Sequence, residues 1–176
     1  VTTSASKRID SSGQRWPQVV RLPLPKPRID RVLNVEEIPL PLDNPYGRGV
    51  RPADISFFGS GRASLVTIDG DVWLGDFVSG DFVPEAGFQP ESQQVVWRRF
   101  ASGLHEPLSI RIRDEEVFVF DRSGLWRLLD RDNNGEADYH ELFCSRIHQT
   151  AETREFPLAL KLERDGGFLV SKPGQG

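Results

Sequence analysis

Two stretches of sequence decide the fold, ASLVTIDGDVWL at Ala63–Leu74 and EVFVFDRSGLWRL at Glu116–Leu128. In the first, β-branched and apolar residues lie on both sides of Asp69 and Gly70 in short runs of alternating character. Such runs are typical of strands, and Asp-Gly is a preferred hairpin turn because both residues tolerate positive φ. The stretch therefore predicts two antiparallel strands joined by a two-residue turn.

Further strands are expected on both sides of this hairpin. Residues 53–58 precede it, and residues 95–100 follow it after a predicted loop at 79–92. Four antiparallel strands in sequence order make a meander. No segment carries a sustained apolar stripe of period 3.6, so the sequence predicts an all-β fold.

The second stretch repeats the first. Trp73 and Trp126 are 53 residues apart, and so are Val66 and Val119. A third copy begins about fifty residues after the second, and the chain ends within it. The strands expected in the second and third copies are, in order, 108–112, 116–120, 123–128, 157–162 and 167–171.

A repeat of about fifty residues, each a four-stranded meander, is typical of a β-propeller, because one small sheet cannot bury both faces alone. Closure takes at least about four blades, so residues 31–176 are expected to form an incomplete propeller of about two and a half blades. We place blade one at about 53–100, blade two at about 108–146 and the start of blade three at about 157–176. The alternative is a compact β-sandwich of roughly ten strands.

The first part of the chain has a different composition. Eight of the 13 prolines lie within the first 52 residues, and basic residues outnumber acidic ones near the start. Proline fixes φ and lacks a backbone donor, so Leu22–Pro27 is expected to be extended. Residues 1–30 are therefore predicted to be a Pro-rich basic linker, followed by a short strand at 31–35.

Composition excludes several classes of protein. The 176 residues carry a net charge of −4, and no apolar run is long enough to span a bilayer. The sequence has no stripe of clustered basic residues, which argues against a nucleic-acid partner. The single cysteine, Cys144, excludes an internal disulfide and a cysteine-based zinc site. Because the chain lacks methionine, we expect it to be a processed or excised piece from which any signal peptide is already gone.

The strongest chemical motif is DRDNNGEADYHE at Asp130–Glu141, which fits the twelve-residue calcium-loop pattern D-x-[DN]-x-[DN]-G-x5-E. Ca²⁺ takes six to eight oxygen ligands, and acidic or amide residues at alternate positions converge on one point when the loop curls around a glycine. The expected ligands are Asp130, Asp132, Asn134, the backbone carbonyl of Glu136, Asp138 and Glu141.

The flanking sequence leaves alternatives open. The segment before Asp130 is too short for the entering helix of an EF-hand, which favours a calcium loop inserted in a β-hairpin and closed by Asp138 rather than Glu141. A plain Asp/Asn/Gly-rich turn without metal is the other interpretation, because these residues bond their own backbone. If a metal binds, we expect its role to be structural.

Other candidate residues give weaker signals. His105 and His148 lie in the connections between blades, where either is a candidate base, although a surface histidine is the simpler interpretation. His140 lies inside the predicted loop. Cys144 is expected to pack as a small apolar residue. Trp73 and Trp126 occupy equivalent positions and are expected to pack between blades.

Three segments resemble the opening blades of exported bacterial proteins similar to the quinoprotein glucose/sorbosone dehydrogenases, which often carry a c-type cytochrome domain. The segments are Gly61–Leu74, Val96–Leu108 and Leu128–Asp138, with a G-L-x-x-P-L link in the second and a D-x-D-x-N-G-x-x-D loop in the third. The resemblance covers roughly residues 30–176. It implies a six-bladed propeller, a periplasmic or extracellular location, and oxidation of a sugar or alcohol with pyrroloquinoline quinone, calcium and a haem acceptor.

The resemblance also bears on sites and partners. Neither His105 nor His148 matches the family's catalytic histidine pattern, so no catalytic or quinone-binding residue is carried over. Most of the quinone site and the haem c would lie outside this segment. The implied partners are the remaining blades of the parent chain and a cytochrome c electron acceptor.

Two functional hypotheses follow. In the first, the chain is the N-terminal part of an exported quinoprotein-dehydrogenase-like propeller with one structural calcium loop, and the segment alone is not active. In the second, it is a non-catalytic propeller or sandwich module that binds proteins or glycans.

Overall fold

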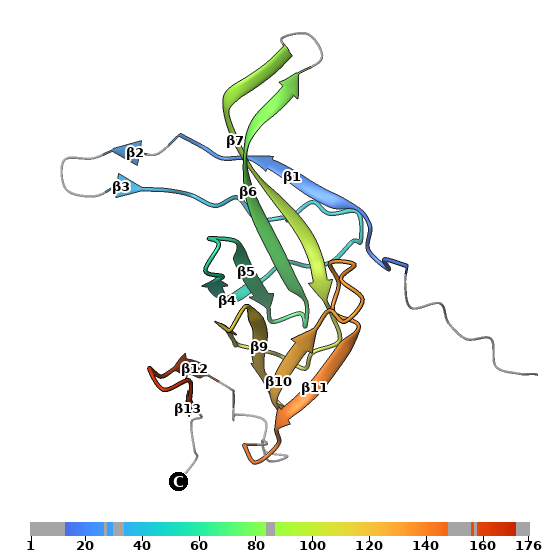
Figure 1. The fold of residues 1–176 in the computed structure, drawn as a ribbon, viewed down its shortest axis with the longest axis vertical. Helices are drawn as coiled ribbons and strands as arrows, with labels where there is room; N and C mark the ends of the chain where they lie inside the picture. Colours follow the sequence, from blue (N-terminus) through green and yellow to red (C-terminus); the bar gives the residue numbers. More distant parts are fainter. Residues whose placement is uncertain are drawn as a thin grey trace, which may run out of the picture.

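The computed structural model describes residues 13–26, 28–29, 34–83, 87–147, 156 and 158–171. Within these ranges every regular element is a β-strand, which confirms the all-β prediction (Figure 1). No helix in the described part of the chain could cross a membrane. The strands are β1 (Val19–Pro23), β2 (Arg28–Ile29), β3 (Asn34–Val35), β4 (Pro52–Phe57), β5 (Ala63–Thr67), β6 (Val72–Val83), β7 (Gly87–Ala101), β8 (Ser109–Arg113), β9 (Glu116–Asp121), β10 (Gly124–Leu129), β11 (Tyr139–Cys144), β12 (Ala159–Leu162) and β13 (Phe168–Ser171).

The strands form two larger sheets and two hairpins, and every pairing is antiparallel. Sheet one has the order β1-β7-β6-β5-β4, and sheet two has the order β11-β10-β9-β8. Strands β12 and β13 pair with each other, as do β2 and β3. Both sheets are open. The two predicted meanders are therefore present, but β6 and β7 continue into the region predicted as a loop at 79–92.

The N-terminal segment is not a linker throughout. Strand β1 pairs with β7, with Val20 opposite Trp97 and Pro23 opposite Gln94. Proline lacks a ladder donor but is tolerated in β1 because β1 is an edge strand. The strand predicted at 31–35 is described only at Asn34 and Val35, where it pairs with β2.

The same N-terminal segment covers one face of sheet one. Trp73 and Trp97 are fully buried on this face, beneath Leu40 and Tyr46. The indole Nε1 of Trp97 donates to the carbonyl of Pro39 at 2.8 Å. Burial of two indoles at about 25 cal/mol per Å² contributes several kcal/mol, so residues before β4 belong to the folded unit.

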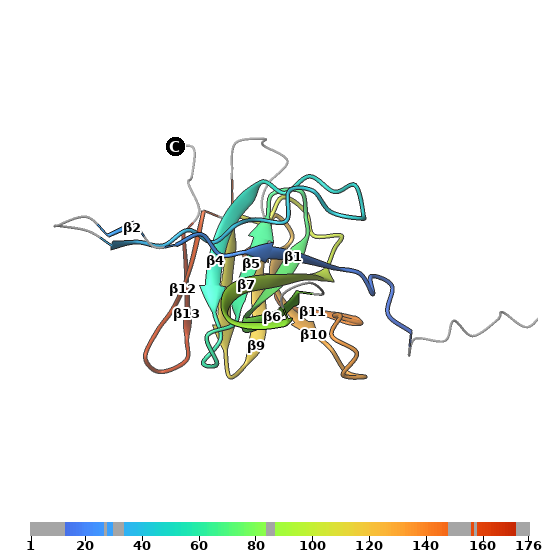
Figure 2. The same cartoon turned by 90° about the horizontal axis from the view of Figure 1, so that it is seen from above.

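The sheets and the hairpin β12–β13 lie beside one another in layers (Figure 2), and apolar side chains fill the space between them. Sheet one meets sheet two through Val66 and Val72 on one side and Val119 and Leu128 on the other, and all four are buried. The hairpin β12–β13 covers the opposite face of sheet two. The buried members of this second contact are Phe118, Phe120, Leu125 and Leu160. Sheet two therefore lies in the middle of the stack.

The repeats stack in the same direction. When β5 and β9 are aligned at their last residue, Phe120 is the equivalent of Val66 and Val119 is the equivalent of Leu65. Val66 and Phe120 both point to the following sheet or hairpin, whereas Leu65 and Val119 both point to the opposite side. At each contact, one face of a sheet therefore packs against the opposite face of the next sheet. In a two-fold sandwich, the same face of both sheets would meet.

The first strands of the three repeats lie side by side, β4 against β8 and β8 against β12. A carboxylate oxygen of Asp54 accepts from the backbone N–H of Ile110 at 3.0 Å and from Arg111 Nη1 at 2.6 Å. Across the next junction, Ser109 Oγ donates to the carbonyl of Leu158 at 3.2 Å. Polar contacts between neighbouring first strands thus accompany the apolar packing.

The turn of sheet one differs from the sequence prediction. It contains three residues, 68–70, because Thr67 N bonds the carbonyl of Asp71, whereas the corresponding turn of sheet two contains two, 122–123. The alignment of the two repeats that made Val66 equivalent to Val119, from their spacing of 53 residues, is therefore wrong by one residue.

Gly70 closes the turn of sheet one and touches the connection to sheet two. Its φ is +91°, and its carbonyl accepts from Leu104 N at 3.2 Å. A Cβ at Gly70 would lie 2.3 Å from the carbonyl oxygen of Leu104, which is far inside van der Waals contact. Gly61 has a similar φ of +88° but nothing within 4 Å of the position of its missing Cβ.

These two glycines make a matched test of the junction. Gly61→Ala should cost about 1 kcal/mol, because only backbone strain is added, whereas Gly70→Ala should cost about 3 kcal/mol because the backbone must also move. Urea unfolding followed by circular dichroism measures both values. Equal losses in the two variants would show that the close approach to Leu104 is not important for stability.

Candidate metal centre

The predicted calcium loop connects two strands, β10 and β11, and not two helices. The loop is closed at its base by a hydrogen bond from Asp138 N to the carbonyl of Leu129 at 3.0 Å. Asn133 and Gly135 both have positive φ, +58° and +89°, so the chain curls within a few residues. The geometry is therefore that of the hairpin alternative, because strands stand where an EF-hand would have helices.

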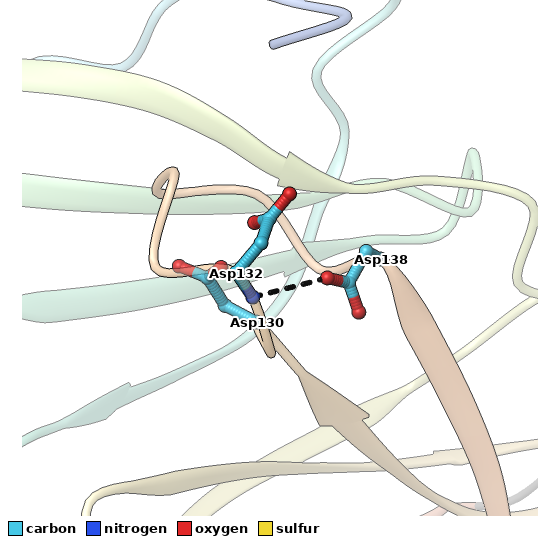
Figure 3. Close-up of side chains that lie close together, drawn as sticks. All are labelled: Asp130, Asp132 and Asp138. Carbon is cyan, nitrogen blue, oxygen red and sulfur yellow. Dashed lines mark hydrogen bonds between the residues drawn. The ribbon is translucent and has the colours of Figure 1, made fainter. Parts of the chain in front are cut away.

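Three carboxylates converge inside the loop (Figure 3). One carboxylate oxygen from each of Asp130, Asp132 and Asp138 lies within 4.8 Å of the others. Asp130 is partly buried, and the other two are exposed to solvent. Three like charges at this separation repel one another, which a divalent cation among them would reverse.

Backbone donors fix the orientation of these carboxylates. Asp130 accepts from Asn134 N at 3.0 Å and from Gly135 N at 2.8 Å. Asp138 accepts from the backbone N–H of Arg131 and Asp132 at 3.2 and 3.3 Å; the second of these bonds is drawn in Figure 3. The loop therefore holds its acidic side chains in place by its own backbone, as the plain-turn interpretation also requires.

Asn134 lies at the rim of this cluster. Its Nδ2 donates to a carboxylate oxygen of Asp132 at 3.1 Å, and its Oδ1 accepts from Glu136 N at 2.8 Å. The amide is thus in direct contact with one of the three aspartates. A rotation of the side chain would bring Oδ1 toward the cluster.

The Glu136 side chain points away from the three aspartates. It is 2% exposed, and its two oxygens accept from the backbone N–H of Arg15 at 2.8 Å and of Trp16 at 2.6 Å. We call residues 14–16 the N-terminal strap. A pair of N–H groups bound by a buried carboxylate is a strong, charge-assisted contact. Glu136 therefore attaches the strap to the loop, a role that the motif did not indicate.

The strap makes further contacts with the loop. Gln14 Nε2 donates to the carbonyl of Asn134, and Arg15 Nη2 donates to the carbonyl of Ala137 at 2.6 Å. Ala137 in turn donates from its backbone N to Phe100 at the end of β7, at 2.8 Å. The loop is thus held between the strap on one side and sheet one on the other.

Glu141 is not part of the cluster. It lies on β11 opposite Arg127 and forms an ion pair with it at 3.3 Å. Of the two residues considered for the last ligand position, the fold places Asp138 with the other aspartates and Glu141 on the strand.

The remaining candidate residues lie elsewhere. His105 is exposed, and its backbone N donates to Asp121 at 2.9 Å. His140 is half-buried on β11, where burial and the nearby charge of Arg15 hold its pKa below the usual value. Cys144 is half-buried against the cluster between sheet two and β12–β13. His148 lies outside the described residues.

Both tryptophans of the repeat are used in packing. Trp73 is fully buried on the covered face of sheet one. Trp126 packs against the contact between sheet one and sheet two, and its Nε1 donates to Asp121 at 2.8 Å. The two residues occupy equivalent positions in β6 and β10 and point to the same side of their sheets.

The donor set of the loop consists of oxygen atoms, which suits a hard cation such as Ca²⁺ and gives no preference for a softer transition metal. Asp130, Asp132 and Asp138 fit Ca²⁺ because the loop is open to solvent and can adjust to a ligand distance of about 2.3–2.6 Å, with water completing the shell. Comparisons with protein-family models, with curated proteins and with solved structures find no match. The assignment of the site therefore depends on its geometry.

The attachment of the strap can be tested at Glu136. Glu136→Gln replaces one acceptor oxygen by a donor that faces a backbone N–H, so the strap should detach more often, at a cost of about 1–3 kcal/mol. Trypsin cleavage after Arg15, followed by mass spectrometry, should become about tenfold faster or more.

The matched control is Glu141→Gln, which also replaces a glutamate of the loop motif by glutamine, but at a side chain that pairs with Arg127 on the neighbouring strand. Cleavage after Arg15 should remain at the wild-type rate in this variant. If the two variants were cleaved equally fast, Glu136 would not hold the strap.

Proposed function

We propose that the loop at residues 130–138 binds Ca²⁺ and that the ion has a structural role. The observation that supports this most strongly is the convergence of carboxylate oxygens from Asp130, Asp132 and Asp138 within 4.8 Å in a hairpin loop whose backbone orients them. Ca²⁺ would relieve their repulsion and contribute binding free energy to the folded state, because the unfolded loop does not assemble these ligands.

The position of the loop favours a structural role. It contacts the strap through Gln14, Arg15 and Trp16, and it contacts β7 through Ala137. An ion that stiffens the loop would therefore strengthen the junction between sheet two, sheet one and the strap.

We further propose that the stacked sheets are consecutive blades of a β-propeller that further blades of the parent chain complete. Three observations support this. The repeat is about fifty residues long, successive sheets stack in the same direction, and β4, β8 and β12 lie side by side as the innermost strands of neighbouring blades do.

The resemblance of Val96–Leu108 and Leu128–Asp138 to exported quinoprotein-dehydrogenase-like proteins supports a more specific proposal. In it, the parent protein is periplasmic or extracellular and oxidises a sugar or alcohol with pyrroloquinoline quinone, passing electrons to a cytochrome c. We assign no residue of this chain to the quinone. With Cys144 as its only cysteine, the chain itself has no two-cysteine haem c motif.

Calcium binding is tested by thermal unfolding with and without the ion. At about a hundredfold excess over its dissociation constant, Ca²⁺ should raise the unfolding midpoint by about 5–10 °C. Asp132→Ala should remove this increase, because it deletes a central ligand.

The control is Asp165→Ala, which removes an exposed aspartate from the β12–β13 turn, where its carboxylate accepts from Gly167 N at 2.9 Å. This variant should keep the full Ca²⁺ effect. An unchanged midpoint on adding Ca²⁺ to the wild-type chain would contradict the proposed site.

The proposal for the parent protein has its own test. Purified parent protein should reduce an artificial dye in the presence of sugars when quinone and Ca²⁺ are added, and should lose this activity when quinone is omitted. Absence of dye reduction across sugars and simple alcohols would favour the second hypothesis, a non-catalytic binding module.

A further inference from the structure

One position on the first strand of each repeat differs in burial. Ile110 on β8 and Leu160 on β12 are 0% exposed, because each packs against the preceding sheet. The equivalent residue on β4 is Ile55, which lies opposite Leu65 as Ile110 lies opposite Val119, and it is 38% exposed. In sheet one, Ile55 is thus partly exposed at a position that the preceding sheet covers in the other two repeats.

Larger apolar side chains extend this uncovered region. Phe57 is 50% exposed and Phe77 is 40% exposed, and their strand partners Ala63 and Val95 are buried on the same face of sheet one. The N-terminal segment covers this face over Trp73 and Trp97 but leaves Ile55, Phe57 and Phe77 exposed, and we call these three residues the open face of sheet one. Exposed apolar residues gathered in one patch are typical of an interaction surface.

A groove of about 460 Å³ lies beside the open face. Phe57 and Phe77 line it together with Leu24 and Ile38 of the N-terminal segment. The exposed Glu36 also lines the groove. The lining therefore combines apolar side chains with a negative charge.

The other end of the stack presents a complementary surface. In β12–β13, Leu160 and Val170 point toward sheet two, so the alternation of side chains turns Lys161 and Leu169 outward. Leu169 is 51% exposed, and Lys161 is exposed beside it. We call Lys161 and Leu169 the outer face of β12–β13. It combines an apolar side chain with a positive charge.

We propose that the 176-residue chain in solution docks the outer face of β12–β13 of one copy onto the open face of sheet one of a second copy. The inference rests on the propeller-type stacking of the proposed function and is independent of the calcium site. At each internal junction, the following face of one sheet meets the preceding face of the next, and the outer face of β12–β13 and the open face of sheet one are a following and a preceding face. In the docked pair Lys161 would approach Glu36. Two copies joined at both ends would form a closed dimer rather than an open chain.

The test measures the mass of the full chain by sedimentation velocity over a wide range of concentration. The wild-type chain should form a species of two copies. Phe57→Ser and Leu169→Ser should each weaken the association by about tenfold or more, because each removes a large apolar contact from one of the two surfaces. Both residues are half exposed, so each variant should keep the wild-type circular dichroism spectrum.

Mixing the two variants separates this head-to-tail contact from a symmetric one. Each variant retains one intact surface, so an equimolar mixture should form a mixed dimer more strongly than either variant alone. The control is Leu42→Ser, which removes a 67% exposed apolar side chain outside both surfaces and should leave the association unchanged.

Two results would overturn the proposal. One is a monomer at all concentrations. The other is an association that Phe57→Ser and Leu169→Ser leave as strong as Leu42→Ser does. Measurements with Ca²⁺ and with a chelator, together with a calorimetric titration of Ca²⁺ alone, keep this outcome separate from a failure of the calcium site.

Discussion

Each sheet of this protein is too small to bury its own apolar side chains, and the rest of the structure depends on that constraint. A four-stranded meander has two faces, and both faces of sheet two carry large apolar residues. Sheet one covers one face, and β12–β13 covers the other. The sheets must therefore stack, and since each hairpin repeats the same alternation, they stack in one direction. Sheet one, as the first of the series, takes a different cover, the N-terminal segment.

Buried charges tie this N-terminal cover to the sheets. Asp71 is fully buried and binds two guanidinium groups, Arg48 Nε at 2.7 Å and Arg99 Nη2 at 2.7 Å. Arg99 also lies over the ring of Trp16, 4.3 Å from its centroid. Because a buried carboxylate without partners is very unfavourable, Asp71 constrains both arginines, and Arg99 in turn supports the strap at Trp16. The strap is thus held from sheet one as well as from Glu136.

The sequence predicted what local patterns determine. Alternation and turn residues predicted the two meanders, and the spacing of Asp130, Asp132 and Asp138 predicted their convergence. It did not predict contacts that join distant segments. The proline-rich composition around Pro23 indicated a linker, because nothing local shows that β7 offers an edge to pair with. The loop motif predicted only a backbone role for Glu136. No local sequence pattern indicates that its side chain binds the strap 120 residues away.

The loop and the strap share partners, so their stabilities are linked. Glu136 and the three aspartates belong to one short loop. Gln14 and Arg15 donate to backbone carbonyls of that loop, and Arg15 also donates to the Glu136 carboxylate. An ion that holds the loop in its folded shape lowers the entropy lost when the strap docks, and linkage requires that the docked strap raise the affinity for the ion by the same factor. Detachment of the strap would remove the backbone donors of Arg15 and Trp16 from the Glu136 carboxylate. The loop at residues 130–138 and the N-terminal cover of sheet one are therefore two parts of one structural unit.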